Sequence, residues 1–207
     1  MIVLIDNGHG VNTPGKCSPD SAKGFTSSPY LFKEYQWARE VAQGLFSVLR
    51  FRGIEAGLLV PEDTDVPLST RAQRVNNICG RHGKNNVLLV SVHVNAAGNG
   101  DKWRSVRGWS IYTTKGVTKA DQLADCIYQQ AVKIFKAPLT VRKNMDKYLE
   151  RDFEENFTIL AKTQCPAVLV ENFFQDNRDD VAYLKSDAGK AACIEVMAAG
   201  IEAYLKK

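Results

Sequence analysis

The segment Val87-Leu88-Leu89-Val90-Ser91-Val92-His93-Val94 decides the fold class. It is a nearly continuous apolar run rich in β-branched residues, which is typical of a strand buried on both faces of a sheet. The polar, glycine-rich segment Asn95 to Gly100 follows and marks its end. Strands of this kind occur mainly in parallel sheets, whose neighbouring strands need helical crossovers. We therefore expect helices on either side of this strand.

Strand and helix patterns alternate along the rest of the chain. Short apolar runs bounded by glycine, proline or polar residues predict further strands at residues 2–5, 54–60, 108–114, 158–160 and 167–170. Apolar residues at helical spacing predict helices at residues 32–52, 67–79, 119–135 and 187–204. Segment 137–155 lacks periodicity, so we expect a long surface excursion there, with a substrate groove as one role for it. The prediction is an α/β fold: a single layered domain, residues 1–207, with a mainly parallel central sheet flanked by helices on both faces.

Composition narrows the class of protein. A chain of 207 residues can bury a substantial core without disulfides, and its five widely spaced cysteines are best interpreted as free thiols, most of them buried. Its apolar runs are far shorter than the ~20 residues needed to cross a bilayer, so we expect no membrane insertion. The net charge of +4 favours anionic polymers such as cell wall or nucleic acid without choosing between them. The start of the chain lacks a signal-peptide pattern, which favours synthesis in the cytoplasm.

Polar side chains at three predicted strand ends are the candidates for chemistry, because ligands of such folds collect beyond the carboxyl ends of the strands. The three segments are Asp6 to Gly10, Ser91 to Asn95 and Val170 to Asn172. Two of the three histidines, His9 and His93, lie in them. Imidazole and carboxylate together suit Zn²⁺, which keeps an open position for water when three protein ligands bind. A third ligand is therefore required.

Each candidate also has a simpler interpretation. Glu34, the candidate third ligand, lies at the start of a predicted helix, where a carboxylate is favourable without any metal. His9 fits a loop imidazole bonded to backbone about as well as a ligand, and its flanking glycines would also allow a phosphate to approach. His93 interrupts an apolar strand and must be paired or metallated if buried. Glu171 fits a solvated ion pair or a general base equally well, and His82 is assigned to solvent.

Taken together, these segments resemble the zinc-dependent N-acetylmuramoyl-L-alanine amidases of the amidase-3 type. Each segment alone is a weak signal, but they occur in the order of that family and extend from the first strand to Asn177. One departure is Val11 to Pro14, which replaces the usual Gly-Gly-x-Asp after the first histidine and affects groove shape rather than ligands. The matching segments are Ile5 to Gly10, Glu34, Leu68 to Arg71 with Asn76, Ser91 to Ala96, Arg107-Gly108 and Pro166 to Phe174.

The resemblance implies a ligand set, a reaction and a setting. It implies that His9, Glu34 and His93 bind one Zn²⁺ and that Glu171 is the catalytic glutamate. The implied substrate is peptidoglycan, cut at the amide between N-acetylmuramic acid and L-alanine of the stem peptide. Asp6 and Asn95 are candidates for orienting the ligands, without assigned roles. The compact chain is similar to phage and prophage lysis enzymes, so we expect a monomer that is released by lysis, acts on the cell wall and binds no nucleic acid.

Three other functions remain open at this point. A phosphate- or nucleotide-binding protein would use Gly8 to Gly10 as an anion cradle, but no glycine-rich nucleotide motif follows. A wall-binding module without catalysis would keep the fold and have no turnover. A zinc enzyme for another peptide or amide would keep the ligands and change the substrate. Four aromatic residues fit either a groove or the core, and the area that their rings bury favours the core: Trp103, Trp109, Phe153 and Phe157.

Overall fold

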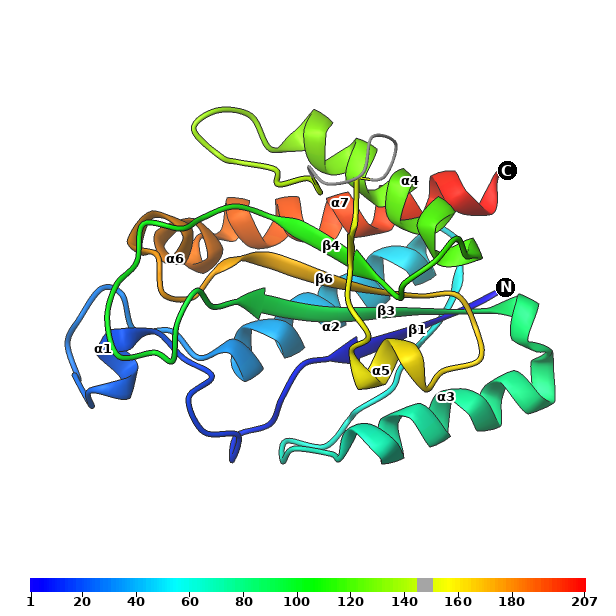
Figure 1. Ribbon diagram of the computed structural model, residues 1–207, viewed down its shortest axis with the longest axis horizontal. Helices are drawn as coiled ribbons and strands as arrows, with labels where there is room; N and C mark the ends of the chain where they lie inside the picture. The colour runs from blue at the N-terminus through cyan, green and yellow to red at the C-terminus, as the bar shows by residue number, and fades with distance from the viewer. Residues whose placement is uncertain (145–150) are drawn as a thin grey trace.

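In a computed structural model, which describes residues 1–144 and 151–207, the described strands form one sheet of six (Figure 1). The strand order is β2-β1-β3-β6-β4-β5. Neighbours are parallel except β4 and β6, which are antiparallel. The predicted fold class, a mainly parallel α/β layer, is therefore confirmed. The strands are β1 (Ile2–Asn7), β2 (Glu55–Leu58), β3 (Val87–Asn95), β4 (Ser110–Thr113), β5 (Phe153–Glu154) and β6 (Ala167–Phe174).

Helices cover both faces of this sheet (Figure 1). Helices α2, α4, α6 and α7 pack on one face, whereas α3 and α5 pack on the other. A single 3₁₀ turn, Lys84–Asn86, leads into β3. The helices are α1 (Pro19–Ala22), α2 (Glu34–Phe51), α3 (Leu68–His82), α4 (Lys119–Ile134), α5 (Thr158–Ala161), α6 (Arg178–Lys185) and α7 (Asp187–Leu205).

Helix α2 shows why the sequence folds as predicted. Its apolar residues recur at helical spacing, so Trp37, Val41 and Leu45 are all buried against the sheet and α7. The helix ends before Gly53, which has a φ of +75°, a left-handed conformation that glycine adopts without strain. Glu34 is the first residue of the helix and also one of its buried residues. The helix thus carries a carboxylate into the interior at the edge of the sheet.

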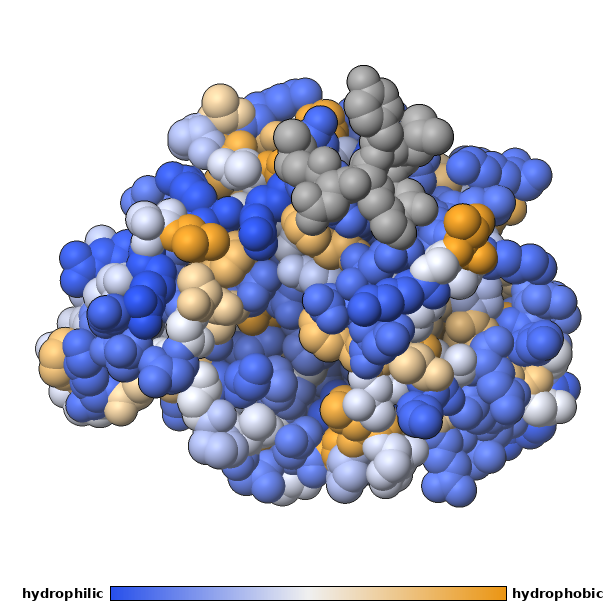
Figure 2. Space-filling view, viewed as in Figure 1, coloured by the Kyte–Doolittle hydropathy of each residue, from blue (hydrophilic) through white to orange (hydrophobic). Residues whose placement is uncertain are grey.

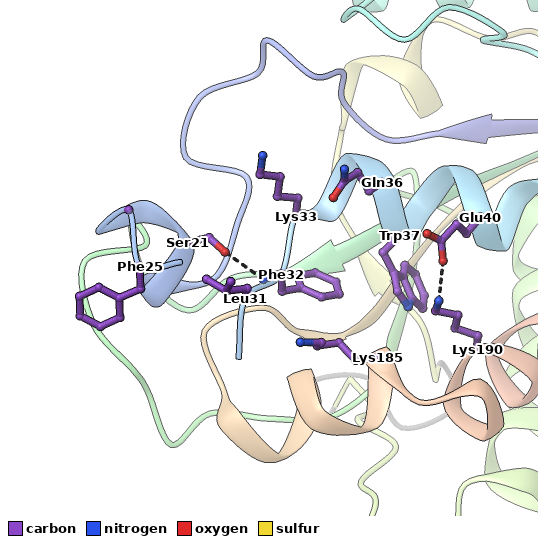
Figure 3. A pocket seen from close by; sticks show the side chains of 11 residues that line it. Ser21, Phe25, Leu31, Phe32, Lys33, Gln36, Trp37, Glu40, Lys185 and Lys190 are labelled. Carbon is purple, nitrogen blue, oxygen red and sulfur yellow. Dashed lines mark hydrogen bonds and ion pairs between the residues drawn. The ribbon is translucent and has the colours of Figure 1, made fainter. Parts of the chain in front are cut away.

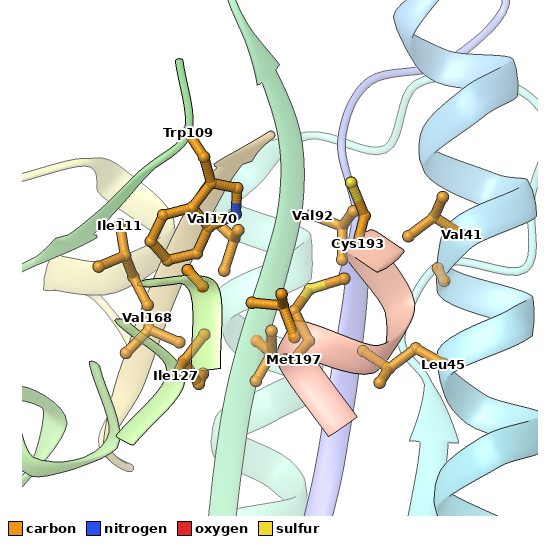
Figure 4. Close-up of a cluster of buried hydrophobic side chains, with 14 of the residues drawn as sticks. Val41, Leu45, Val92, Trp109, Ile111, Ile127, Val168, Val170, Cys193 and Met197 are labelled. Carbon is orange, nitrogen blue, oxygen red and sulfur yellow. The ribbon is translucent and has the colours of Figure 1, made fainter. Parts of the chain in front are cut away.

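The larger core lies between the sheet and the helices α2, α4 and α7. In Figure 4, Val92 of β3 and Val170 of β6 meet Met197 of α7, with Leu45 of α2 and Ile127 of α4 beside them. On the face shown in Figure 2 the surface is mostly hydrophilic, and exposed apolar side chains are scattered rather than gathered. This distribution is normal for a soluble-type surface layer and marks no single apolar docking patch there. Among the described helices, none combines the length and apolarity that a bilayer span requires.

Two predictions about the segments outside the central strands were wrong. Residues 158–160, predicted as a strand, form helix α5, because Ile159 and Leu160 bury side by side in one turn packed near α3. Segment 137–155 is not simply a surface excursion. Val141 bridges to Trp109, and β5 extends the sheet by pairing with β4. The part of the predicted excursion at 145–150 lies outside the described residues.

Several elements were not predicted. The short helix α1, the two-residue strand β5 and helix α6 have no clear periodic signal, and α6 begins at a side-chain cap, where Asn177 Oδ1 accepts from the Asp180 amide. The last strand also runs to Phe174 rather than ending near Val170. All five cysteines are free, and four of them are buried. Among the four aromatics in question, Trp109 lies fully in the core, whereas Phe157 is 37% exposed.

Candidate metal centre

The candidate site lies where the order of the strands reverses. The chain passes from β1 outward to β2 through α2, and then crosses to the other side of β1, where β3 pairs with it. In open parallel sheets, a crevice forms at this point beyond the carboxyl ends of the strands. His9 follows β1, His93 lies near the end of β3, and Glu34 begins the helix that follows β1. The topology therefore gathers three residues that are far apart in sequence.

His9, Glu34 and His93 form a compact cluster. One oxygen of Glu34, Oε1, lies 3.2 Å from His93 Nδ1 and 3.5 Å from His9 Nε2. The rings of the two histidines are nearly perpendicular, with centroids 5.0 Å apart. One potential ligand atom from each residue lies within 4.8 Å of the others. Glu34 is held in place by the amide of Val94, which donates to Oε1 at 2.9 Å.

Gly8 explains how His9 comes so close to His93. A Cβ at position 8 would lie 2.5 Å from the His93 ring, a distance that side chains do not tolerate. The Gly8 amide also donates to Val92 O at 3.0 Å, which fixes the turn onto β3. The glycine therefore permits close approach of backbone and imidazole, rather than forming an anion cradle. A phosphate-binding role for this loop loses its main support.

Burial and neighbouring charges set the protonation of the cluster. Burial lowers the pKa of His9 to about 4, although Glu34 acts in the opposite direction, so this imidazole is neutral near pH 7. Burial acts to lower the pKa of His93, but its hydrogen bond and attraction to Glu34 outweigh it and the pKa is raised. Burial acts to raise the pKa of Glu34, and its contacts with the histidines outweigh it and lower the pKa. Without a cation, Glu34 and His93 thus share a charge-assisted hydrogen bond.

Glu171 lies beside this cluster on the adjacent strand. It is the direct register partner of His93 in the parallel pair β3–β6, so the two side chains project from the same face of the sheet. The sequence placed Glu171 at a strand end, but β6 continues to Phe174; the register changes between His93 and Asn95, which opens the edge there. Glu171 Oε2 is buried without a partner among the described residues. Burial, with some repulsion from Glu34, raises the pKa of Glu171 to about 8.

The cluster suits a bound cation. Glu34 Oε2 is buried and has no hydrogen-bond partner among the described residues, although the side chain is only 1% exposed. A buried carboxylate oxygen is costly to leave unpaired, and a cation would remove that cost. Two imidazoles and one carboxylate are the donor types that Zn²⁺ accepts, with room for further ligands. Among the described residues, this is the only group of His, Cys, Asp or Glu with such spacing.

The residues expected to orient the ligands do so less directly than predicted. Asp6 contacts neither imidazole; it pairs with Arg71 at 2.7 Å and accepts a hydrogen bond from Ser91. Asn95 Oδ1 accepts from the adjacent Ala96 amide. His82 is exposed, as predicted. Arg71, quoted in the sequence only as part of a motif, is 1% exposed and bonds to the backbone of the His9 loop.

A separate depression of about 530 Å³ lies on another face of α2. Figure 3 shows Gln36, Trp37 and Glu40 of α2 facing Lys185 and Lys190, with Phe32 between them. Lys190 pairs there with Glu40, and none of the four candidate site residues lines this depression. The candidate metal centre and this depression are therefore distinct features.

Fold and site together define a class: α/β proteins with a candidate single-metal centre of two histidines and a glutamate at the switch point of a mainly parallel sheet. A sequence profile narrows the class further. Residues 3–203 match the family described as N-acetylmuramoyl-L-alanine amidase. The match covers nearly the whole chain. The chain belongs to this family.

Individual relatives agree with this assignment. The chain is 30% identical over 212 residues to the endolysin of Bacillus phage SPP1, covering 99% of this chain and 66% of that protein. It is 23% identical over 238 residues to N-acetylmuramoyl-L-alanine amidase AmiC of Neisseria meningitidis, covering 99% of this chain and 52% of AmiC. The crystal structure of an N-acetylmuramoyl-L-alanine amidase from Clostridium difficile 630 has the same fold: TM-score 0.77, 23% identity, 100% of this chain and 97% of that one. The chain thus spans about half to two-thirds of these two sequence relatives and nearly all of the crystallised one.

Proposed function

We propose that the chain is the catalytic domain, residues 1–207, of a zinc-dependent N-acetylmuramoyl-L-alanine amidase. The observation that supports it most is the cluster of His9, Glu34 and His93, whose potential ligand atoms lie within 4.8 Å of one another, next to Glu171. Family membership supplies the substrate: peptidoglycan, at the amide between N-acetylmuramic acid and L-alanine of the stem peptide. One Zn²⁺ per chain is part of the proposal.

The three proposed ligands have complementary roles. His9 is neutral near pH 7, since its pKa is about 4, and it can donate a nitrogen lone pair without first losing a proton. Glu34 supplies a negative charge, and its Val94 hydrogen bond fixes which oxygen faces the histidines. When bound, zinc supplies a Lewis acid for the carbonyl oxygen and makes water more acidic. The chain contributes a preformed, largely buried set of donors that holds it.

Glu171 is the proposed general base and acid. Amide hydrolysis requires a proton to leave the attacking water and a proton to reach the departing nitrogen, because an amine leaves poorly as an anion. The Glu171 carboxylate can take the first proton and deliver it to the nitrogen, so that water and amide become a carboxylic acid and an amine. Its burial beside His93 keeps the pKa near the working pH, where a carboxyl both accepts and returns a proton readily.

The setting of the enzyme follows from the same relatives. Similarity to the SPP1 endolysin favours a role in lysis, with the cell wall as the place of action. The mildly basic chain, with a net charge of +4, favours encounter with an anionic wall polymer. We propose a monomer that acts on peptidoglycan and has no nucleic-acid partner.

Digestion of purified peptidoglycan tests this function. The native protein is incubated with the polymer alone, with a chelator, and with the chelator followed by added zinc, and the soluble products are analysed by mass spectrometry. We expect free stem peptides that begin with L-alanine, lost with the chelator and restored by zinc. Cleavage at another bond would change the assigned substrate bond. Binding to the polymer without cleavage at any zinc concentration would favour a wall-binding module instead.

A further inference from the structure

The His9 turn has an unusual backbone. His9 has a φ of +61°, the left-handed region that non-glycine residues rarely occupy. The turn is tightly enclosed, because a Cβ at Gly10 would lie 2.0 Å from the Asp65 amide nitrogen. Such a conformation costs of order 1–3 kcal/mol and persists only where its surroundings enforce it. Something must therefore hold His9 in this turn.

Two arginines from different helices converge on the carbonyl oxygen of His9. Arg39 of α2 donates to it through Nη1 at 3.0 Å, and Arg71 of α3 lies at 3.5 Å through Nη2. Arg39 also donates to Glu62 O at 2.6 Å. Arg71 donates to Asn7 O at 2.6 Å. The turn is thus fastened to both helices and to the facing loop.

This arrangement brings two cations close together, which is unfavourable unless it is compensated. Arg71 is compensated by ion pairs with Asp6 at 2.7 Å and Asp65 at 2.8 Å. Arg39 has no ion pair among the described residues; its Nε is buried without a partner, and burial together with the charge of Arg71 lowers its pKa. Its other contacts are backbone carbonyls of the His9 turn, its own helix and the facing loop. Local rules broken in this way are typical of functional sites.

We propose that Arg39 and Arg71 are positioning residues that lock His9 in its left-handed turn and so hold its imidazole against Glu34 and His93. This inference rests on the proposed function, in which His9 is a zinc ligand. Helix α2 would then serve the site twice, through Glu34 at its start and through Arg39 farther along. Neither arginine touches the cluster of ligand atoms, so both act through the backbone of His9.

Arg39→Gln is the test variant, because Arg39 is half-buried and its loss leaves no buried carboxylate unpaired. Arg74→Gln is the matched control: Arg74 is also half-buried, bonds to Glu62 and donates to a backbone carbonyl, Leu59 O at 3.0 Å, but does not contact His9. The zinc Kd is measured by competition with a chromophoric chelator. The absorption spectrum with Co²⁺ in place of zinc reports ligand geometry. The thermal midpoint of the metal-free proteins reports stability.

We expect Arg39→Gln to bind zinc roughly 10–100-fold more weakly than the native chain and to alter the Co²⁺ spectrum. Its metal-free thermal midpoint should shift no more than that of Arg74→Gln, which should bind zinc normally. Arg39→Lys, a point charge that cannot reach both carbonyls, should fall between Arg39→Gln and the native chain.

Native-like zinc affinity in Arg39→Gln, or an equal loss in Arg74→Gln, would overturn the positioning role. Failure of the native chain itself to bind zinc would instead overturn the proposed function. The two failures are therefore distinguishable in one set of titrations.

Discussion

Two buried polar clusters lie side by side at the same edge of the sheet, and they differ in how completely they are paired. In the arginine cluster, Arg71 donates to Asp6, to Asp65 and to the backbone, and Ser91 completes Asp6. In the metal-ligand cluster, one oxygen of Glu34 is buried without a partner among the described residues, and so is one oxygen of Glu171 beside it. Polar groups in protein interiors are normally paired, so the incomplete cluster is the exception.

The difference separates structure from chemistry. A complete buried network holds strands and loops in register, and its loss is paid in folding free energy. An incomplete cluster holds groups ready for a ligand, so its loss changes binding and turnover more than stability. Substitutions in the two clusters should therefore give opposite patterns, and each prediction below can break this distinction or sharpen it.

The largest effect is expected for His93→Ala. Removing one of three proposed ligands should weaken zinc binding by more than the roughly 100-fold seen for residues that only orient ligands, and abolish turnover. The metal-free variant should remain folded, because only the contact with Glu34 is lost within the site. Zinc titration, peptidoglycan digestion and circular dichroism measure the three quantities. A variant that binds zinc as the native chain does would remove His93 from the ligand set.

Glu171→Ala should separate turnover from metal binding. We expect zinc affinity close to that of the native chain and a loss of turnover of about 10²–10⁴-fold, the usual contribution of a positioned acid or base. Peptidoglycan digestion at saturating zinc gives the rate, and the same chelator competition gives the affinity. Full activity in this variant would assign the proton transfer to another group.

Asp6→Asn should give the opposite pattern, a loss of stability. Breaking one member of a buried ion pair typically costs about 3–5 kcal/mol, and Arg71 would keep only Asp65 as an ionic partner. Asp179→Asn is the matched control, because Asp179 pairs with Arg107 at 3.1 Å but its side chain is 75% exposed; we expect less than about 1 kcal/mol there. Urea unfolding of the metal-free proteins measures both. Equal costs would show that burial does not distinguish the two pairs.

The comparison also explains what the sequence could predict. Apolar runs and helical spacing predicted the central strands and the long helices, because burial on a sheet leaves a periodic record. The residues His9, His93 and Glu171 stood out because polar groups at the ends of apolar strands are rare. The structure brings them together with Glu34, whose role a helix-start position alone could not distinguish from a favourable terminal charge.

Other features leave no local record. Arg39 reads in the sequence as an ordinary polar residue of an amphipathic helix, since its contact with His9 O depends on how α2 crosses the loop after β1. Helix α5 is a single turn, and Ile159-Leu160 fits a strand or a buried turn equally well until packing near α3 decides. Strand β5 has two residues and forms because β4 offers an edge. These misses are tertiary effects rather than failures of local pattern.

Glu171→Gln tests the incomplete cluster through pH. The folded pKa of Glu171 is about 8, above its ordinary value, so the folded chain binds more protons than the unfolded chain between about pH 4.5 and 8. Glu171 therefore makes the native chain lose stability as pH rises through this window. In the presence of chelator, Glu171→Gln should gain on the native chain between pH 5 and 8, by at least about 1 kcal/mol. Thermal or urea unfolding at several pH values checks this, with the exposed Glu40→Gln as control. A difference that is constant with pH would contradict it.

The smallest effect concerns two buried serines with opposite pairing. Ser91 and Ser110 are both fully buried, but Ser91 donates to Asp6 whereas Ser110 Oγ has no partner among the described residues. Ser91→Ala leaves an oxygen of a buried carboxylate unpaired, so we expect a cost of about 1–3 kcal/mol. Ser110→Ala removes a hydroxyl that makes no bond, and its stability should stay within about 0.5 kcal/mol of the native chain or rise. Urea unfolding resolves this difference. If both substitutions cost the same, pairing would not be what separates the complete cluster from its surroundings, because the two side chains differ mainly in that one hydrogen bond.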